Sequence, residues 1–359
     1  MHTKLGGGGR IEYIDAMRGF SMILVVFGHV LLMMGFPTNS TILGSILLTF
    51  RMPLFFFVSG FFAYRTMDKW TSKLTKSVLK RKVQAQIVCT LVFYSIFQLC
   101  HSQSPLLFLN NGFSWFWFTI VLFQMFIIYL IAALLEHKFK KPIVPGFLIV
   151  TALILFFIHV KYPSQHFRAW IILEWYYLTE YFQFFVFGVL VRKYYQIFLK
   201  FIEKDSAKTV IILSYIILLF CVYGFDGKLS ILNSSIYNLF NMVLVRYAGL
   251  LTIFILFSFN QKYFSDEYKP ARWLRLVGRR TLDVYMLHVF VLPNLIFLKP
   301  YLEGPGMLLS QLTIGIIASI INIAVCLFIS LILRSSNILS QWLFGEKSRT
   351  TLSQTVLMP

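Results

Sequence analysis

Residues 113–135 read FSWFWFTIVLFQMFIIYLIAALL and contain no Asp, Glu, Lys, Arg or His. About 20 predominantly apolar residues are enough for an α-helix to cross the hydrocarbon core of a bilayer. A helix is favoured for such a run because lipid offers no partners for backbone polar groups, so the segment must satisfy them internally. This stretch therefore predicts a transmembrane helix.

The rest of the chain has the same character. Its 359 residues are 58% hydrophobic and only 13% charged, whereas soluble domains are about 25% charged. Outward from residues 113–135 we find further apolar runs of similar length. The predicted spans are, approximately, 14–34, 42–64, 83–100, 113–135, 143–159, 169–190, 208–225, 236–260, 281–298 and 306–333. We expect an all-α, polytopic membrane helical bundle with about ten transmembrane helices.

One membrane domain is expected, because no stretch outside the predicted spans is long enough to bury a core of its own. Its predicted limits are residues 13–334. A short cytoplasmic lead, residues 1–12, precedes it, and a short cytoplasmic tail, residues 335–359, follows it.

The net charge of +19 is distributed in a way that indicates membrane topology rather than nucleic-acid binding. Of the 33 Lys and Arg residues, 26 fall in the termini and loops on one side of the predicted spans, and 4 fall in loops on the other side. By the positive-inside rule both termini are then cytoplasmic. We therefore expect the lipid bilayer as a partner, and no nucleic acid. The four cysteines have no metal-ligand spacing, so neither a metal site nor a disulfide framework is predicted.

The first span carries three ionisable residues, Asp15, Arg18 and His29. At 100° per residue, Arg18 and His29 differ by only about 20° around a helix, and Asp15 lies within about 60° of both. Three polar groups on one face predict the lining of a cavity. Two simpler interpretations remain open: an interfacial ion pair of Asp15 with Arg18, and a His29 that only packs between helices.

Two further spans carry candidate polar residues. Arg51 lies mid-way along the second span, in the motif RMPLFFFVSG of residues 51–60. A guanidinium keeps its charge, so Arg51 needs a salt bridge, a water-filled pocket or a substrate anion. In the ninth span Thr281, Tyr285 and His288 share a face at i, i+4 and i+7. A structural, hydrogen-bonded His288 is as good an interpretation as a functional one.

Together these motifs resemble the acyltransferase 3 family of membrane-embedded O-acyltransferases. The resemblance rests on Ile14 to Gly19 followed by Gly28-His29, on Arg51 to Phe61, and on Gly278 with Thr281, Tyr285 and His288. A weaker similarity is Trp117-Phe118-Thr119 in the fourth span. The resemblance as a whole covers nearly the whole chain. It implies a multi-pass protein of the inner (plasma) membrane that transfers an acyl group, acetyl in particular, from acyl-CoA to a hydroxyl of a glycan or lipid-linked sugar.

The resemblance also implies roles for individual residues. His29 is the expected catalytic residue, either as general base or as a transient acyl carrier. Arg18 or Arg51 would orient the thioester or stabilise its oxyanion, with Asp15 positioning Arg18. Acyl-CoA is expected as a co-substrate rather than as a bound cofactor. The residues expected to bind donor or substrate are Lys80, Arg81, Lys82, Tyr285, His288 and Trp117.

Some of these assignments have alternatives. The family commonly has a proline after the basic residues of the third span, and this chain has Val83-Gln84-Ala85-Gln86 there. The seven basic residues of the 65–82 loop are explained equally well if they only determine the orientation of the protein in the membrane. Some family members carry an extracytoplasmic hydrolase-like domain. None is predicted in these 359 residues, so we expect a separate extracytoplasmic transferase or glycan-assembly partner as one alternative. The competing function is a transporter or flippase that uses the intramembrane charges as a substrate pathway.

Overall fold

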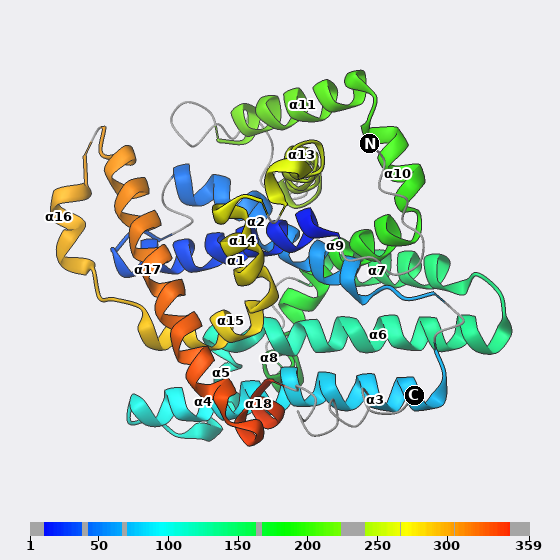
Figure 1. Ribbon diagram of the computed structural model, residues 1–359, viewed down its shortest axis with the longest axis horizontal. Helices are drawn as coiled ribbons and strands as arrows, with labels where there is room; N and C mark the ends of the chain where they lie inside the picture. The colour runs from blue at the N-terminus through cyan, green and yellow to red at the C-terminus, as the bar shows by residue number, and fades with distance from the viewer. Residues whose placement is uncertain are drawn as a thin grey trace. The chain divides into compact units, whose positions relative to one another are not determined.

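The computed structural model describes residues 11–37, 42–66, 70–162, 167–223, 241–265, 267–304 and 306–344. Every regular element in these ranges is a helix, so the predicted all-α class is confirmed (Figure 1). The chain forms two compact units. The first comprises Met1–Phe55, Leu199–Thr281 and Pro293–Ile323, and the second Phe56–Phe198, Leu282–Leu292 and Ala324–Pro359.

The helices long and apolar enough to cross a membrane agree closely with the predicted spans. Among the described residues there are eight, or nine if one bent pair is a single span. The eight are Glu12–Met33, Gly44–Ala63, Ser72–Cys100, Ser114–Phe139, Ile143–Lys161, Asp205–Val222, Asn241–Phe259 and Leu308–Ser335. The ninth, Thr281–Val291 with Ile296–Leu302, is bent by 70°.

Of the ten predicted spans, residues 169–190 are the one that is not among these helices. They form a short helix α8 (Arg168–Ile172) and, after a break, α9 (Trp175–Lys193). α9 is long enough to cross a bilayer at 1.5 Å per residue. However, Tyr, Thr, Glu and Gln side chains in its first half make it less apolar than the other spans.

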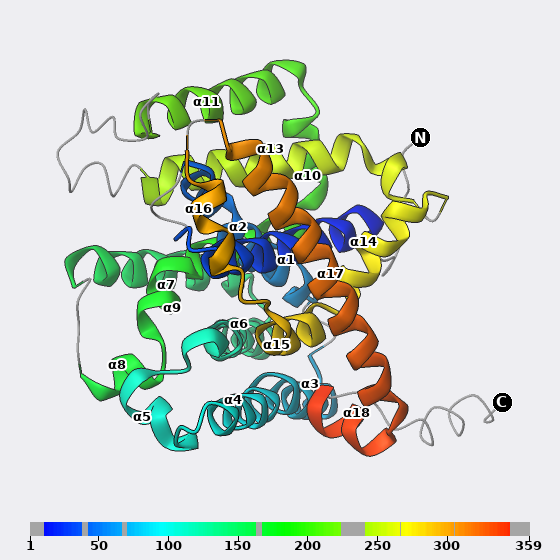
Figure 2. The same ribbon diagram turned by 90° about the vertical axis from the view of Figure 1, so that its left-hand side faces the viewer.

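The third predicted span is part of a longer rod. α3 (Ser72–Lys82), a π-helical segment η2 (Val83–Val88) and α4 (Cys89–Cys100) follow one another without interruption (Figure 2). α3 begins at an N-cap, where the Thr71 hydroxyl accepts a hydrogen bond from the Leu74 N–H at 3.3 Å. The sequence placed these residues in a loop because the basic side chains end the apolar run, although Lys and Arg are good helix formers.

In the first unit, helix α1 (Glu12–Met33) packs against α14 (Lys269–Arg279) at backbone contact distance. A Cβ at Gly19 would collide with the carbonyl oxygen of Leu274, and a Cβ at Gly278 with that of Asp15. An ion pair of Glu12 with Arg275, 2.6 Å long, joins the same two helices. α14 lies within the predicted loop 261–280, so part of this loop is a helix docked on α1.

The second unit has α6 (Trp117–Phe139), α7 (Ile143–Lys161) and α9 side by side (Figures 1 and 2). The last part of α2 (Ile42–Ala63) packs closely on α9, where a Cβ at Gly60 or at Gly188 would collide with a carbonyl oxygen of the other helix. Small residues such as these let helix backbones meet in lipid.

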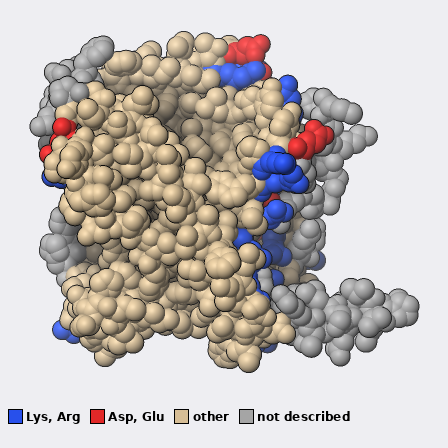
Figure 3. Space-filling model, turned by 60° about the vertical axis from the view of Figure 1, so that its left-hand side comes forward, with Lys and Arg blue, Asp and Glu red and all other residues tan. Residues whose placement is uncertain are grey.

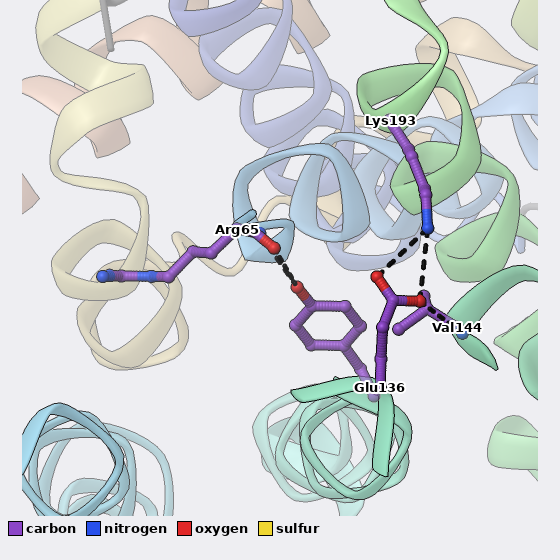
Figure 4. A network of polar contacts seen from close by, with 5 residues as sticks. Arg65, Glu136, Val144 and Lys193 are labelled. Atoms are coloured by element: carbon purple, nitrogen blue, oxygen red, sulfur yellow. Dashed lines mark hydrogen bonds and ion pairs between the residues drawn. The ribbon is translucent and has the colours of Figure 1, made fainter. Parts of the chain in front are cut away.

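Polar contacts join the ends of these helices. Glu136 of α6 accepts a hydrogen bond from the Val144 N–H at 2.7 Å and pairs with Lys193 of α9 at 3.2 Å (Figure 4). The Tyr129 hydroxyl accepts a hydrogen bond from the Arg65 N–H at 2.8 Å. Figure 3 shows a face on which few Lys, Arg, Asp and Glu side chains appear, as suits contact with lipid.

Candidate functional site

The first group of candidate residues lies on α1. Asp15, Arg18 and His29 all belong to this one uninterrupted helix, so their predicted common face follows directly from helical geometry. The rise from Arg18 to His29 is about 16 Å. Asp15 is buried, with 3% of its surface exposed.

Arg18 and His29 differ from their neighbours in exposure. Met17, Gly19, Gly28 and Val30 are buried, whereas both side chains on the polar face keep part of their surface accessible. Both side chains are therefore accessible in part, as the lining of a polar cavity requires.

Arg51 belongs to the same unit and sits two residues before Pro53 inside helix α2. It is 9% exposed and lies among buried apolar residues such as Met52 and Leu54. Two residues earlier, the Thr49 hydroxyl is hydrogen-bonded to the Tyr215 hydroxyl at 2.9 Å. Arg51 is therefore held within a well-packed part of the unit.

The residues predicted to bind donor or substrate belong to the second unit, where they form two separate groups. Lys80, Arg81 and Lys82 end helix α3; Lys80 is exposed and the other two are half-buried. The ammonium of Lys82 lies 5.0 Å from the ring centroid of Phe126 on α6. Directly after them comes the π-helix η2, a type of segment that occurs frequently at functional sites.

Tyr285 and Trp117 form the other group, at the beginning of α6. The Tyr285 hydroxyl donates to the Trp115 carbonyl at 2.8 Å and accepts from the Phe118 N–H at 3.2 Å. It therefore fixes the start of α6. Phe126, against which Lys82 lies, is nine residues further along this helix than Trp117, a rise of about 14 Å. The two groups thus occupy different positions along α6.

His288 is fully buried in the same helix as Tyr285, α15 (Thr281–Val291). Its Nδ1 lies 2.7 Å from the carbonyl oxygen of Tyr285 and 3.2 Å from that of Val284. This nitrogen is thus used within its own helix, which favours the structural interpretation of His288.

Two polar contacts of the second unit were not predicted from the sequence. Asp283, 1% exposed, receives two hydrogen bonds from Arg334, at 2.6 and 2.7 Å, and one from the Ser330 hydroxyl. This pair satisfies a buried carboxylate and anchors the end of α17 (Leu308–Ser335). The signal in the sequence was a lone acidic residue one turn into the ninth span.

The second missed contact involves Glu174, in the break between α8 and α9, outside the helices that qualify as membrane spans. Its Oε1 accepts the Phe113 N–H at 2.5 Å. Burial raises the pKa of this carboxyl to about 7, although the hydrogen bond from Phe113 acts in the opposite direction.

The comparisons with known proteins add one match. The model of the acyltransferase 3 family, described as an acyltransferase domain, matches residues 11–331. Searches of curated proteins and of solved structures find no match.

Proposed function

The chain belongs to the acyltransferase 3 family, and from this premise we propose that it transfers an acyl group, acetyl in particular, from acyl-CoA to a hydroxyl of a glycan or lipid-linked sugar. It is a multi-pass membrane protein and an acyltransferase. The observation that carries the proposal is the polar face of α1, where Arg18 and His29 stay accessible between buried neighbours.

His29 is the residue to which we assign the chemistry. A sugar hydroxyl is a weak nucleophile, and histidine is the side chain most often used to accept its proton. In direct transfer His29 takes the hydroxyl proton, the oxygen attacks the thioester carbonyl, the C–S bond breaks, and the proton passes to the CoA thiolate. In the alternative route the imidazole attacks the thioester carbonyl, the C–S bond breaks and CoA leaves as the thiol with the imidazole proton. The acceptor hydroxyl then attacks the acyl-imidazole, the acyl C–N bond breaks, and the hydroxyl proton passes to the imidazole.

The arginines and the basic end of α3 have supporting roles. Arg18 or Arg51 stabilises the oxyanion formed on the thioester, and Asp15 positions Arg18. Lys80, Arg81 and Lys82 bind the phosphates of CoA from the cytoplasm, because phosphates favour charge-assisted hydrogen bonds from such cations. Less basic residues of the domain bind the pantetheine and acyl parts of the donor.

The compartment and the acceptor follow from the same proposal. We place the protein in the inner (plasma) membrane with both termini cytoplasmic, so that donor and envelope glycan arrive from opposite sides. Any further transfer of the product outside the membrane would fall to a separate extracytoplasmic partner. Family membership favours this enzyme over the transporter or flippase that the intramembrane charges alone would allow.

The test compares envelope glycans from cells with and without the gene by mass spectrometry. Loss of about 42 Da per acetylated sugar, or of a larger acyl mass, supports the proposal. Identical glycan masses in both strains, with the protein present at a normal level in the wild type, would contradict it. Release of CoA from acyl-CoA by the purified enzyme without acceptor, in an amount equal to the enzyme, would identify the acyl-histidine route.

A further inference from the structure

A cluster of aromatic and polar side chains lies where α6 and α9 begin, apart from the residues to which we assign the chemistry. Trp117 is the first residue of α6, Tyr177 lies in the first turn of α9, and Glu174 directly precedes that helix. The rings of Trp117 and Tyr177 stack with centroids 3.9 Å apart and an interplanar angle of 21°. Both rings are half-buried, so each keeps part of its surface accessible.

The backbone fixes the carboxylate of Glu174, which lies three residues before Tyr177 in the chain. Glu174 has a φ of +55°, which L-residues rarely adopt. Its Oε1 accepts the Phe113 N–H at 2.5 Å, and Gly112, with a φ of +69°, packs so closely that a Cβ there would collide with the same oxygen. Ser114, which follows Phe113, also has a positive φ, +49°. Unusual backbone conformations gather at functional sites, and here they gather around one carboxylate.

Three polar atoms of the cluster are left available. Glu174 Oε2, the Tyr177 hydroxyl and Trp117 Nε1 have no hydrogen-bond partner in the described part of the chain, and none of them is sealed in the interior. They offer an acceptor, a group that both donates and accepts, and a donor. A sugar ring needs this combination, because its hydroxyls require both kinds of partner and its C–H face packs on aromatic surface.

The position of the cluster along its helices indicates which compartment it faces. Trp117 follows the loop 101–112, and Glu174 follows the loop 160–168; both loops belong to the set with few basic residues, predicted to be extracytoplasmic. Lys80 to Lys82, by contrast, belong to a loop predicted to be cytoplasmic. A glycan of the cell envelope would reach the cluster directly, whereas cytosolic acyl-CoA would not.

We propose that Trp117, Tyr177 and Glu174 form a binding subsite for one sugar residue of the acceptor glycan. This inference rests on the proposed function and deepens it. It also narrows the role of Trp117, which was predicted to bind donor or substrate, to the substrate, because its neighbours Tyr177 and Glu174 suit a neutral, hydroxyl-rich ligand.

The experiment measures sugar binding without requiring turnover. Full-length protein in lipid nanodiscs is mixed with methyl α-glucoside, methyl α-galactoside and methyl N-acetyl-β-glucosaminide, and saturation-transfer NMR records which glycoside receives magnetisation. We expect transfer to at least one of them in the wild type. Trp117→Leu and Glu174→Gln should each weaken it by about tenfold, the scale of losing one strong contact. Tyr176→Phe, one position from Tyr177 and 39% exposed, is the matched control and should leave the signal unchanged.

Two further variants separate this inference from the proposed function. His29→Ala should bind the glycoside as the wild type does while losing acyl transfer, and Glu174→Gln should keep the wild-type affinity for CoA. Absence of transfer to every glycoside in the wild type would overturn the subsite, as would wild-type binding in both Trp117→Leu and Glu174→Gln. Normal acylation by His29→Ala would instead overturn the catalytic assignment and leave the sugar-binding result standing.

Discussion

His29 is the residue on which the chemistry depends most directly. His29→Ala removes one half-exposed imidazole and adds no bulk to the helix, so folding should be normal. Acyl transfer should be abolished, because the other titratable group on that face of α1, Asp15, is about 21 Å away along the helix axis. His29→Gln should be nearly as inactive, since it keeps size and hydrogen bonding but not basicity. The measurement is acylation of envelope glycans at a verified protein level.

The matched control is a second membrane histidine. His288 bonds to backbone carbonyls within its own helix, so His288→Ala should reduce activity less than His29→Ala and should act through stability. Wild-type acylation in cells that contain only His29→Ala would end the assignment.

Glu174 should make the stability of the folded protein depend on pH. Its pKa is raised to about 7 by burial, from an ordinary value of 4.5. The folded state therefore holds the proton more tightly than the unfolded state, and the protein loses stability as pH rises from about 4.5 to about 7. Glu174→Gln keeps the acceptor for the Phe113 N–H but cannot titrate, so its unfolding temperature should fall less between pH 5 and pH 8 than that of the wild type. If the unfolding temperatures of the wild type and of Glu174→Gln fell equally between pH 5 and pH 8, this prediction would be contradicted.

Individual residues also show what sequence alone could predict. The common face of Asp15, Arg18 and His29 was predictable because one helix fixes the angle between its own side chains. The ion pair of Asp283 with Arg334 was not, because the two residues lie on different helices and periodicity contains no information on which helices meet. For the same reason the accessible cluster of Trp117, Tyr177 and Glu174 could not be found in the sequence.

Among the elements, the basic end of α3 is the one assigned to the donor. Replacing Lys80, Arg81 and Lys82 together by Gln should weaken CoA binding by about tenfold or more at low salt. The difference from the wild type should narrow as salt is added, because exposed charges are screened. Isothermal titration calorimetry with CoA at two ionic strengths measures both effects.

A charge-matched control is available in the same unit. Lys138, Lys140 and Lys141 are exposed and lie in a loop predicted to be on the same side of the membrane. Their triple replacement by Gln changes the net charge equally and should leave CoA affinity close to that of the wild type. If both triple variants lost the same CoA affinity, residues 80–82 would have a topological role only.

The close contact of α2 with α9 predicts an asymmetry between two glycines. Gly188→Ala should destabilise the protein by about 1–3 kcal/mol, because the new Cβ would meet the Phe57 carbonyl oxygen and force the helices apart. Gly146→Ala on α7 meets nothing within 4 Å, and alanine is the better helix former. It should therefore be neutral or slightly stabilising. Circular dichroism measures the unfolding of both purified variants. Equal changes in the free energy of unfolding for Gly188→Ala and Gly146→Ala would show that the contact is unimportant.

The spans themselves were largely predictable, while their interruptions were not. Length and apolarity locate a helix in lipid, and they do so here for nearly every span. They do not reveal the π-helix at Val83–Val88, the bend after Val291 in the ninth span, or the docking of α14 on α1. These features depend on contacts with other helices. At the π-helix and the bend, such contacts compensate for changed backbone hydrogen bonds, and at α14 they bury one face of a polar helix.

At the scale of the whole molecule, the two compact units divide the predicted residues. The residues assigned to catalysis, Asp15, Arg18, His29 and Arg51, belong to the first unit, and those assigned to the donor belong to the second. The chain enters each unit more than once, so neither corresponds to a continuous segment of sequence. The family match extends over segments of both units, which agrees with an activity that requires the whole membrane region.

The membrane topology determines on which side every proposed site lies. Reporter fusions after Gln103 and after Gly227, the latter outside the described residues, should give extracytoplasmic signals, and fusions after Thr75 and after Lys269 should give cytoplasmic ones. The reason is the distribution of basic residues, 26 on one side against 4 on the other, since Lys and Arg near short loops resist translocation. Alkaline phosphatase and green fluorescent protein fusions report the two sides independently and so control for each other. A cytoplasmic signal at Gln103 would move the loop before Trp117 to the side of the donor. It would thereby remove the argument that the cluster at Trp117, Tyr177 and Glu174 faces the envelope glycan.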